Sequence, residues 1–294
     1  MAARYDTVSF LSDYGTADEF VGVVKSVLRS LAPHAAVIDI THEIPPHDVR
    51  AGGLCLARAC QYLTAGVVLA VVDPGVGTAR RALAVEVGGG ESVLVGPDNG
   101  LLAPAVALVG GATRAVLLTN PDLRLPAAGA TFDGRDLFAP AAAHLCNGIP
   151  LGDLGEDIDP ALLRPGVMPL TRVEGGAVVA EALWVDRFGN VQLNVDPAEV
   201  AEFGPRIGVE WGEQSRTGTL AVAYGELSAG EVGLVVDSYG LLSIALDRRS
   251  AAEELGLGPG SQVTLRALAD DPLVDVAPPV PITLRARTSP SGAG

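Results

Sequence analysis

The chain has 294 residues, more than a usual single domain, so its length favours two domains. Hydrophobic residues make up 48% of it and aromatic residues only 4%, so Ala, Val and Leu must fill the core. The net charge of -15 at pH 7 argues against nucleic acid as a partner, because phosphate binding needs a basic face, and it disfavours anionic membrane surfaces.

The sequence also bears on the compartment in which the protein works. It contains no run of about 18 apolar residues, so no membrane-spanning helix is predicted. Met1 to Arg4 lead straight into a predicted strand, without the apolar region of a signal peptide. The cysteines Cys55, Cys60 and Cys146 are odd in number and lack metal-ligand spacing, which suits reduced thiols. These features predict a cytoplasmic protein.

Residues 1–165 alternate strands and helices in the manner of α/β proteins. Short apolar, β-branched runs predict the strands, and apolar residues at helical spacing predict the helices. The predicted strands span residues 7–12, 37–40, 67–72, 82–87, 93–95 and 115–118. The predicted helices span residues 18–31, 48–62, 101–108 and 135–146. This order predicts an N-terminal α/β/α domain with a central, mostly parallel sheet.

The character of the sequence changes after Pro160, Pro165 and Pro169, which mark a predicted linker. The β segments that follow are separated by glycine, with one short helix near residues 250–255; they span residues 177–185, 191–195, 218–223, 232–237 and 241–245. This pattern predicts a small antiparallel barrel or sandwich, a C-terminal β domain over residues 171–267. The Pro-, Ser- and Gly-rich residues 277–294 are predicted to form a disordered tail.

Two carboxylates stand where apolar strands end. Asp13 follows the strand at residues 7–12, and Asp73 follows the strand at residues 67–72. In open α/β sheets, ligands bind in the crevice beyond the carboxyl ends of such strands. The two acids therefore predict a polar small-molecule site. The alternative is that each acid only forms a turn or caps a helix.

The segment from Asp73 to Arg81 has the most residues typical of a ligand-binding site. Two glycines after a strand let the backbone approach a ligand closely, and Arg80 can fold back to pair with Asp73. Such a pair in a crevice can hold and polarise a water molecule while both side chains stay charged. The structural alternative is a tight β-hairpin closed by a salt bridge, and the motif alone does not decide between the two.

Two further turn-rich segments precede predicted helices. In residues 96–100, Asp98 or Asn99 is interpreted chiefly as a turn former or N-cap. Residues 131–136 place polar groups at the anion-favouring end of a helix. The alternative for this second segment is a capping turn in which Asp136 pairs with Arg135.

Nothing in the sequence predicts a metal or a cofactor. His34, His42, His47 and His144 do not cluster, and no phosphate-binding loop, nucleophile elbow or dinucleotide fingerprint is present. The residues alone therefore predict an α/β plus β protein with an acidic polar site, and they do not name its substrate.

Five motifs that occur in order along the chain supply a resemblance. They are Phe-Leu-Ser-Asp-Tyr-Gly at 10–15, Val-Asp-Pro-Gly-Val-Gly at 72–77, Gly-Pro-Asp-Asn-Gly-Leu-Leu at 96–102, Gly-Arg-Asp-Leu-Phe-Ala-Pro at 134–140 and Asp-Arg-Phe-Gly-Asn at 186–190. Over about residues 6–267 the chain resembles the S-adenosylmethionine hydroxide adenosyltransferases, relatives of the fluorinase and chlorinase. The resemblance implies cleavage of S-adenosylmethionine at C5′ by water, giving adenosine and methionine without a cofactor. It also implies a homotrimer whose sites lie between the N-terminal domain of one subunit and the C-terminal β domain of its neighbour.

The resemblance implies a role for each residue that matches a motif. Residues that would position and activate the attacking water are Asp73 and Arg80. Residues that would bind substrate are Asp13 at the ribose hydroxyls, Asn190 at the adenine edge, Phe188 near the adenine ring, and Asp186 and Ser238 at the methionine end.

One position departs from the family pattern. The water-using members carry a catalytic histidine before Gly-Arg-Asp, and this chain has Asp133 there. As a third catalytic residue, Asp133 could accept the proton of the water, but beside Asp73 it meets like-charge repulsion and a raised pKa. Two other functions therefore stay open beside hydrolysis: a halide-dependent 5′-halo-5′-deoxyadenosine synthase, and a protein that binds S-adenosylmethionine or adenosine without turnover.

Overall fold

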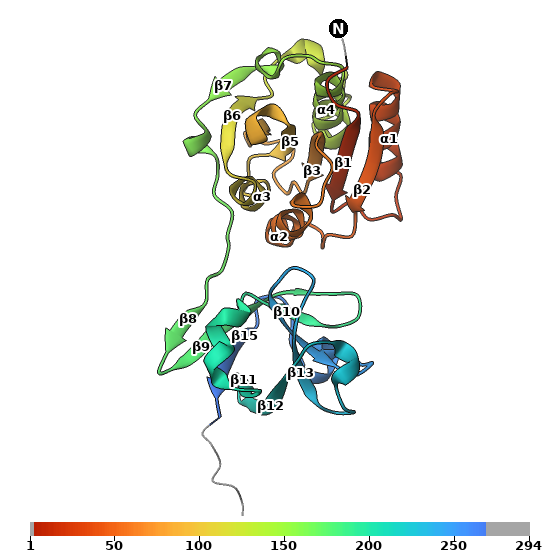
Figure 1. Cartoon of the computed structure of the whole chain (residues 1–294). Helices are drawn as coiled ribbons and strands as arrows, with labels where there is room; N and C mark the ends of the chain where they lie inside the picture. The colour runs from red at the N-terminus through yellow and green to blue at the C-terminus, as the bar shows by residue number, and fades with distance from the viewer. Residues whose placement is uncertain (1–2, 269–294) are drawn as a thin grey trace, which may run out of the picture.

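The computed structural model describes residues 3–268, which fold around two separate β-sheets (Figure 1). The tail predicted for residues 277–294 lies outside the described residues. The first sheet is formed by the first seven strands and is flanked by helices, and the second is formed by the remaining strands. The predicted fold class, α/β followed by a small β-barrel, is confirmed.

The first sheet has the strand order β2-β1-β3-β5-β4-β6-β7. Its strands are β1 (Thr7–Ser12), β2 (Ala36–Thr41), β3 (Val67–Val71), β4 (Ala82–Val87), β5 (Ser92–Pro97), β6 (Ala112–Leu117) and β7 (Glu156–Ile158). Strands β2, β1, β3 and β5 are parallel to one another, and β4, β6 and β7 add an antiparallel edge. The short, exposed β7 is not evident from hydrophobicity alone.

Helices cover both faces of this sheet. They are α1 (Phe20–Leu31), α2 (Val49–Cys60), α3 (Ala103–Leu108) and α4 (Ala139–Cys146). Strand β1 shows how alternation divides the core: Val8 and Phe10 pack with α1 and α4, whereas Leu11 packs with α2 and α3. Side chains buried on both faces explain why the central strands read as continuous apolar runs.

The second sheet closes on itself. Its strands are β8 (Arg172–Glu174), β9 (Ala177–Val185), β10 (Val191–Leu193), β11 (Arg206–Trp211), β12 (Gln214–Ala221), β13 (Val232–Val236), β14 (Leu242–Leu246) and β15 (Gln262–Ala267). The order is β10-β14-β13-β12-β11-β15-β9-β8, and β10 also pairs with β9, which completes a seven-stranded barrel. All neighbours are antiparallel except β12 and β13, because the chain between them, residues 222–231, crosses back before β13 begins.

Shorter helical segments complete the described chain. The helix α5 (Ala251–Leu255) lies close to its predicted position, and the indole of Trp211 donates to the Leu255 carbonyl oxygen at 2.8 Å. Short 3₁₀ segments span residues 88–90, 121–123, 151–154, 160–162, 197–203 and 224–226. None of the helices within residues 3–268 combines the length and apolar character needed to cross a membrane.

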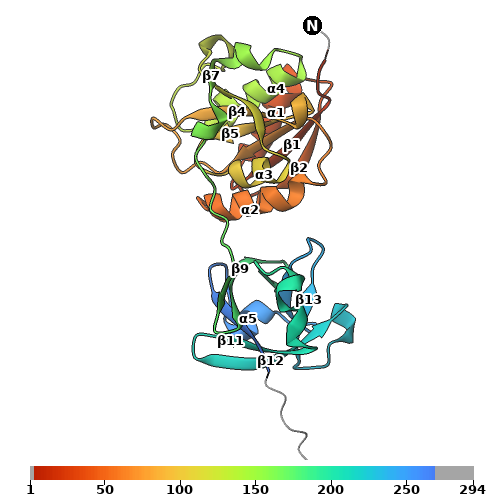
Figure 2. The ribbon, with the colours of Figure 1, turned by 60° about the vertical axis from the view of Figure 1, so that its left-hand side comes forward.

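Helix α2 lies on the side of the first sheet nearest the barrel, in both views of the chain (Figures 1 and 2). The Arg50 guanidinium of α2 pairs with the Glu181 carboxylate of β9, Nη2 to Oε1, at 2.5 Å. Asp48 caps α2, because its carboxylate accepts from the Ala51 amide at 2.8 Å. Helix α2 therefore packs on the first sheet and also contacts the barrel.

Candidate active site

The two strand-end acids lie at the same edge of the first sheet. Strands β1 and β3 pair in parallel, so Asp13 and Asp73, which follow them, emerge side by side. Both line a cavity of about 240 Å³, together with Asp133 and the aromatic rings of Tyr14 and Phe132. The cavity lies where α/β proteins bind their ligands, beyond the carboxyl ends of parallel strands.

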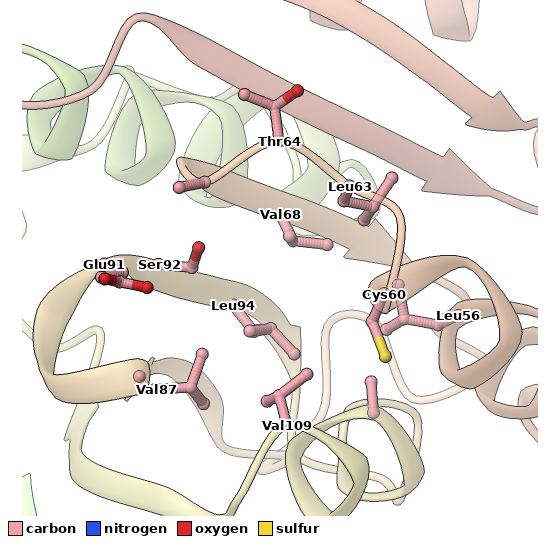
Figure 3. Close-up of a pocket in the computed structure, with 13 residues that line it drawn as sticks. Leu56, Cys60, Leu63, Thr64, Val68, Val87, Glu91, Ser92, Leu94 and Val109 are labelled. Atoms are coloured by element: carbon pink, nitrogen blue, oxygen red, sulfur yellow. The ribbon is translucent and has the colours of Figure 1, made fainter.

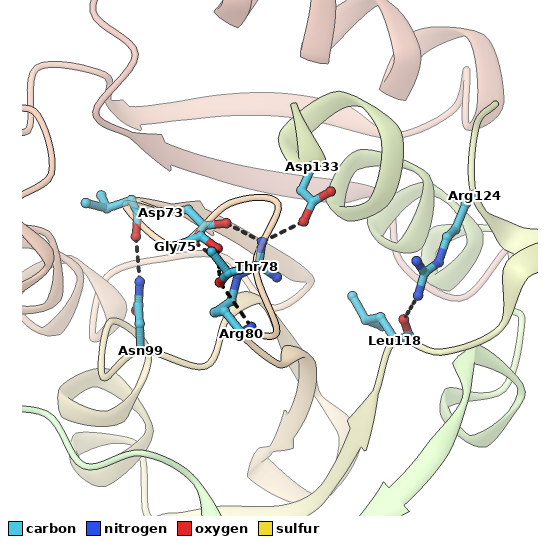
Figure 4. A network of polar contacts seen from close by, with 9 residues as sticks. Asp73, Gly75, Thr78, Arg80, Asn99, Leu118, Arg124 and Asp133 are labelled. Atoms are coloured by element: carbon cyan, nitrogen blue, oxygen red, sulfur yellow. Dashed lines mark hydrogen bonds and ion pairs between the residues drawn. The ribbon is translucent and has the colours of Figure 1, made fainter. Parts of the chain in front are cut away.

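Arg80 bridges two carboxylates beside this cavity (Figure 4). Its Nε donates to Asp73 Oδ1 at 3.1 Å, and its Nη2 lies 2.5 Å from both Asp73 Oδ2 and Asp133 Oδ2. The side chains are 9% exposed for Arg80, 6% for Asp73 and 25% for Asp133, so the most open carboxylate faces the cavity. One guanidinium shared by two carboxylates leaves this cluster with a net negative charge when all three groups are ionised.

The environment of Asp73 changes its acidity. Burial raises its pKa above the ordinary aspartate value, Arg80 opposes that rise, and the charge of Asp133 adds to it. The result is a raised pKa in a carboxyl that is held in place by a cation. A carboxylate of this kind is suited to accept a proton from a positioned water molecule.

The turn after β3 folds Arg80 back onto Asp73. The Thr78 hydroxyl donates to the Gly75 carbonyl oxygen at 2.7 Å and accepts from the Arg80 amide at 3.3 Å. Gly77 has φ 75° and lies against the Ala130 backbone, where a Cβ would collide. The alternative of a β-hairpin is excluded, because β5 lies between β3 and β4 in the sheet.

Asp13 is held by the loop after β2. Its Oδ2 accepts from the His47 amide at 2.9 Å, and His47 has a left-handed backbone with φ 69°. A non-glycine residue in that region is strained, and such strain gathers at functional sites. Within residues 3–268 the structure gives Asp13 Oδ1 no protein donor, so this oxygen can accept from a ligand.

Aromatic residues that sequence reasoning missed form one wall of the cavity. Phe132 packs edge-on against Phe20 and Tyr14, with ring centroids 5.1 and 5.8 Å apart. Burial, reinforced by the nearby carboxylates, raises the pKa of Tyr14, so its hydroxyl stays neutral and can donate. Phe20 begins α1, and Tyr14 and Phe132 come from two other segments, so only the meeting of three segments reveals the wall.

The segment after Asp133 begins with a π-helical turn, residues 134–138, before α4. Pro140 has no amide proton to donate to the Asp136 carbonyl oxygen four residues back, which accepts from Leu125 N at 2.9 Å instead. Asp136 pairs with Arg135 through two hydrogen bonds of 2.6 and 2.8 Å, as in the structural interpretation of this segment. Asp133 makes no capping bond to this turn.

Residues 96–100 form a structural turn. The Asn99 side chain donates to the Val72 carbonyl oxygen at 2.8 Å and accepts from Leu101 N at 3.1 Å. Asp98 is buried, and it accepts from the Arg81 Nε at 2.7 Å and the Arg164 amide at 2.8 Å. Neither residue caps α3, which begins only at Ala103, so the N-cap interpretation is wrong.

On the barrel, the acidic residue Asp186 organises its own loop between β9 and β10. Its Oδ1 accepts from the amides of Phe188 and Asn190 at 2.8 and 2.9 Å, and its Oδ2 accepts from Asn190 Nδ2 at 2.8 Å. Phe188 is 78% exposed. Phe188 and Asn190 line a cavity of about 650 Å³ with Tyr224 and Arg248, two residues that sequence reasoning did not select.

Ser238 stands on the neighbouring loop, between β13 and β14. It is exposed, and the adjacent Asp237 shapes the loop by accepting from the amides of Tyr239 and Leu241 at 2.8 and 3.2 Å. Within residues 3–268 of a single chain, no hydrogen bond or ion pair joins these barrel residues to Asp13, Asp73, Arg80 or Asp133. The structure thus brings the candidate residues together as two separate groups.

A third cavity, of about 220 Å³, lies at the amino ends of β3 and β5 (Figure 3). Its lining is mainly apolar and includes Leu56, Leu94 and Val109, together with the charged side chain of Glu91. Burial raises the pKa of the Cys60 thiol here, which disfavours its thiolate form. Across residues 3–268, no three His, Cys, Asp or Glu side chains meet as a candidate metal site.

The chain is thus an α/β domain joined to a closed β-barrel, with an arginine-bridged acid pair beside a polar cavity at the sheet edge. The chain belongs to the SAM hydroxide adenosyltransferase family: the model of the family's N-terminal domain matches residues 8–155, and that of its C-terminal domain matches residues 180–264. The resemblance found in the motifs is thereby confirmed.

Named relatives agree with this assignment, and a solved structure shares the fold. A Salinispora tropica protein named (R)-S-adenosyl-L-methionine hydrolase is 46% identical over 260 residues, covering 88% of this chain and 97% of the relative. A protein of Actinoplanes sp. named Fluorinase is 25% identical over 292 residues, covering 88% and 96%. The crystal structure of an uncharacterized conserved protein from Thermotoga maritima superposes with a TM-score of 0.82 at 33% identity, covering 88% of this chain and 99% of that one.

Proposed function

We propose that this chain hydrolyses S-adenosylmethionine to adenosine and L-methionine by in-line attack of water at C5′. The observation that carries the proposal is the Asp73–Arg80–Asp133 cluster, which lies beside the cavity that Asp13 also lines. Relatives named hydrolases are far more similar to the chain than those named fluorinases, at 46% against 25% identity. The hydrolase names specify the (R) form, so we propose this sulfonium epimer as the substrate.

The chemistry needs a positioned nucleophile and little else. The leaving sulfur is a sulfonium, so the C5′–S bond breaks with its electron pair going to sulfur and without an acid. Water forms the new C5′–O bond and gives up one proton, which Asp73 or Asp133 accepts. Holding water in line and desolvated supplies most of the acceleration in such a reaction. The proposal involves no metal or redox cofactor.

The substrate would span the two groups of residues. Asp13, whose Oδ1 has no donor within residues 3–268, suits the ribose hydroxyls, because a carboxylate accepts strongly from such donors. The larger barrel cavity suits adenine, with Phe188 and Tyr224 offering ring faces and Asn190 a hydrogen-bonding edge. Asp186 and Ser238 would take the methionine end.

The separation of these groups within one chain supports a homotrimer with shared sites. In such an assembly, the sheet edge of one subunit faces the barrel loops of its neighbour. A mixing experiment tests this arrangement at S-adenosylmethionine concentrations well below KM: Asp73→Asn and Asn190→Ala subunits, each with low activity alone, should regain activity when refolded together, because some sites then combine two intact halves. Failure to regain activity in mixed trimers, or full activity of a monomer, would contradict the shared site.

Halide attack is disfavoured by charge. Asp73 places a negative charge where a halide would have to sit. Repulsion of unit charges at ~4 Å, with an effective dielectric of about 20, is about 4 kcal/mol, which suppresses halide relative to neutral water. Incubation with S-adenosylmethionine in chloride buffer, followed by chromatography, should therefore yield adenosine. A main product of 5′-chloro-5′-deoxyadenosine would overturn the proposal, and so would a bound substrate that is never turned over.

The reaction is assigned to the cytoplasm. All three cysteines are free, and unpaired thiols persist in a reducing compartment. The partner we propose is the small-molecule substrate, with neither nucleic acid nor a membrane involved. The net charge of -15 supports both exclusions.

A further inference from the structure

Arg58 of α2 crosses from the first sheet to the barrel. Its guanidinium carbon lies 5.2 Å from the ring centroid of Trp184 and 5.7 Å from that of Tyr239, both within cation–π range. Its Nη1 also lies 3.5 Å from the Gln192 side-chain oxygen. Trp184 belongs to β9, Gln192 to β10 and Tyr239 to the β13–β14 loop, so one side chain touches three elements of the barrel.

The contacts of Arg58 continue into the loop that carries Ser238. Gln192 is 5% exposed, and its amide nitrogen donates to Asp237 Oδ2 at 2.5 Å. The ring of Tyr239 contacts the Arg58 guanidinium, and the backbone amide of Tyr239 donates a hydrogen bond to Asp237. Both neighbours of Ser238 in sequence are therefore tied to α2, one directly and one through Gln192.

We propose that Arg58 is a positioning residue, through which docking of the two sheets of one chain fixes the subsite for the amino-acid end of S-adenosylmethionine. The inference rests on the proposed function, in which Ser238 takes that end of the substrate. Ser238 is exposed, and Tyr239 is 50% exposed, so the loop has little packing of its own. Holding such a loop in its binding conformation beforehand lowers the entropy lost when substrate binds.

The test compares two substrates. One is S-adenosylmethionine, and the other is 5′-deoxy-5′-dimethylsulfonioadenosine, which keeps the reacting sulfonium but lacks the amino-acid end. Arg58→Met keeps the length of the side chain and removes the charge. It should raise KM for S-adenosylmethionine about tenfold, leave kcat within twofold, and leave kcat/KM for the truncated substrate within twofold. Arg58→Lys keeps a cation over the rings and should recover part of the lost affinity.

The matched control is Arg50→Met. Arg50 lies on the same helix and pairs with Glu181 across the same boundary, but within residues 3–268 its side chain makes no hydrogen bond or ion pair to the loop that carries Ser238. It should leave both substrates within twofold of the unmodified enzyme. If Arg58→Met and Arg50→Met weaken both substrates alike, the contact only joins the two sheets and the inference is overturned.

A second variant keeps the inference testable if Arg58→Met does not fold. Gln192→Leu removes the hydrogen bond to Asp237 and should produce the same selective rise in KM. An unchanged KM for S-adenosylmethionine in this variant contradicts the inference. The unmodified enzyme separates the two proposals: if it releases no adenosine from S-adenosylmethionine, the proposed function fails, whereas an active enzyme with unselective variants removes only the role of Arg58.

Discussion

The sheet edge and the barrel loops use the same residue type in opposite ways. Asp73 and Asp133 at the edge share one arginine, and both line the cavity at the sheet edge. Asp186 and Asp237 on the barrel accept hydrogen bonds from the amides of their own loops. A carboxylate shared through a cation keeps acid–base capacity for a substrate, whereas one used by loop amides provides shape. In the proposed function, the Asp73–Asp133 pair therefore serves chemistry, whereas Asp13 and the barrel loops, Asp186 included, serve recognition.

The strongest way to break this comparison is to neutralise Asp73. Asp73→Asn should lower kcat by about 10³-fold, within the range for one positioned acid–base group, while binding of substrate changes little. Because burial raises the pKa of Asp73, its ionised form is less favourable in the folded chain than in the unfolded chain. Removing that charge should therefore not lower the melting temperature at pH 7. Initial rates of adenosine release and thermal melting measure both effects. A variant that keeps its kcat would remove Asp73 from the chemistry.

The second test addresses the departure at Asp133. Asp133→His places a neutral hydrogen-bonding group there and removes one of the two carboxylates on Arg80. We expect adenosine formation to accelerate roughly 10²-fold, with substrate binding nearly unchanged, because the effect lies in the chemical step. Single-turnover kinetics are the measurement. A slower Asp133→His enzyme, together with an inactive Asp133→Ala enzyme, would instead make Asp133 the working base of a two-carboxylate reaction.

The third test probes the loops. Asp186→Ala removes three hydrogen bonds that shape the loop carrying Phe188 and Asn190. KM should rise about tenfold, equivalent to about 1.4 kcal/mol, and kcat at saturation should change little. Steady-state kinetics over a wide substrate range separate the two constants. A fall in kcat at constant KM would place chemistry on the barrel and end the division.

The fourth test uses pH. Asp73 must be ionised to accept a proton, and its folded pKa is raised, so kcat should fall on acidification at a pH above the ordinary aspartate value. Asp133 contributes to that raised pKa, so Asp133→Asn should move the acid limb to lower pH whatever its absolute rate. Profiles of kcat against pH for the two enzymes provide the comparison. An acid limb that does not move would show that the charge of Asp133 does not contribute to the raised pKa of Asp73.

The smallest expected effect comes from an acid that serves structure alone. Asp196 accepts from the Ala198 amide at 2.9 Å, and its own amide donates to Glu199 in a capping box. Asp196→Ala should lower the free energy of unfolding by about 1 kcal/mol and leave both kinetic constants unchanged. Denaturant unfolding and kinetics on the same preparation test this. Altered kinetics would show that barrel stability and turnover are coupled.

Local patterns predicted most of the first sheet and only part of the barrel. The buried strands β1 and β3 are apolar on both faces, so their sequences identify them without knowledge of their partners. Strand β11 was missed although Ile207, Val209 and Trp211 alternate toward the core, because Gly208 and Glu210 interrupt the apolar run. Alternation alone was the signal that could have found it.

The candidate site, too, was predictable only in part. The pairing of Arg80 with Asp73 spans seven residues and is visible in the motif, as is the place of Asp133 before its helix. The wall formed by Tyr14, Phe20 and Phe132, and the contribution of Tyr224 to the barrel cavity, depend on segments far apart in sequence. Such meetings follow from the closure of the whole fold, which no local pattern encodes.

The π-helical turn after Asp133 has a consequence for how this chemistry can change over generations. Pro140, Leu125 and Gly134 set the path of the backbone there, and the side chain at 133 makes no bond that the turn requires. The identity of that side chain can therefore be exchanged while the helix keeps its direction and its phase. Codons for aspartate and histidine differ in a single base. One mutation thus separates two versions of the acid–base machinery on an unchanged scaffold, and selection can sample both.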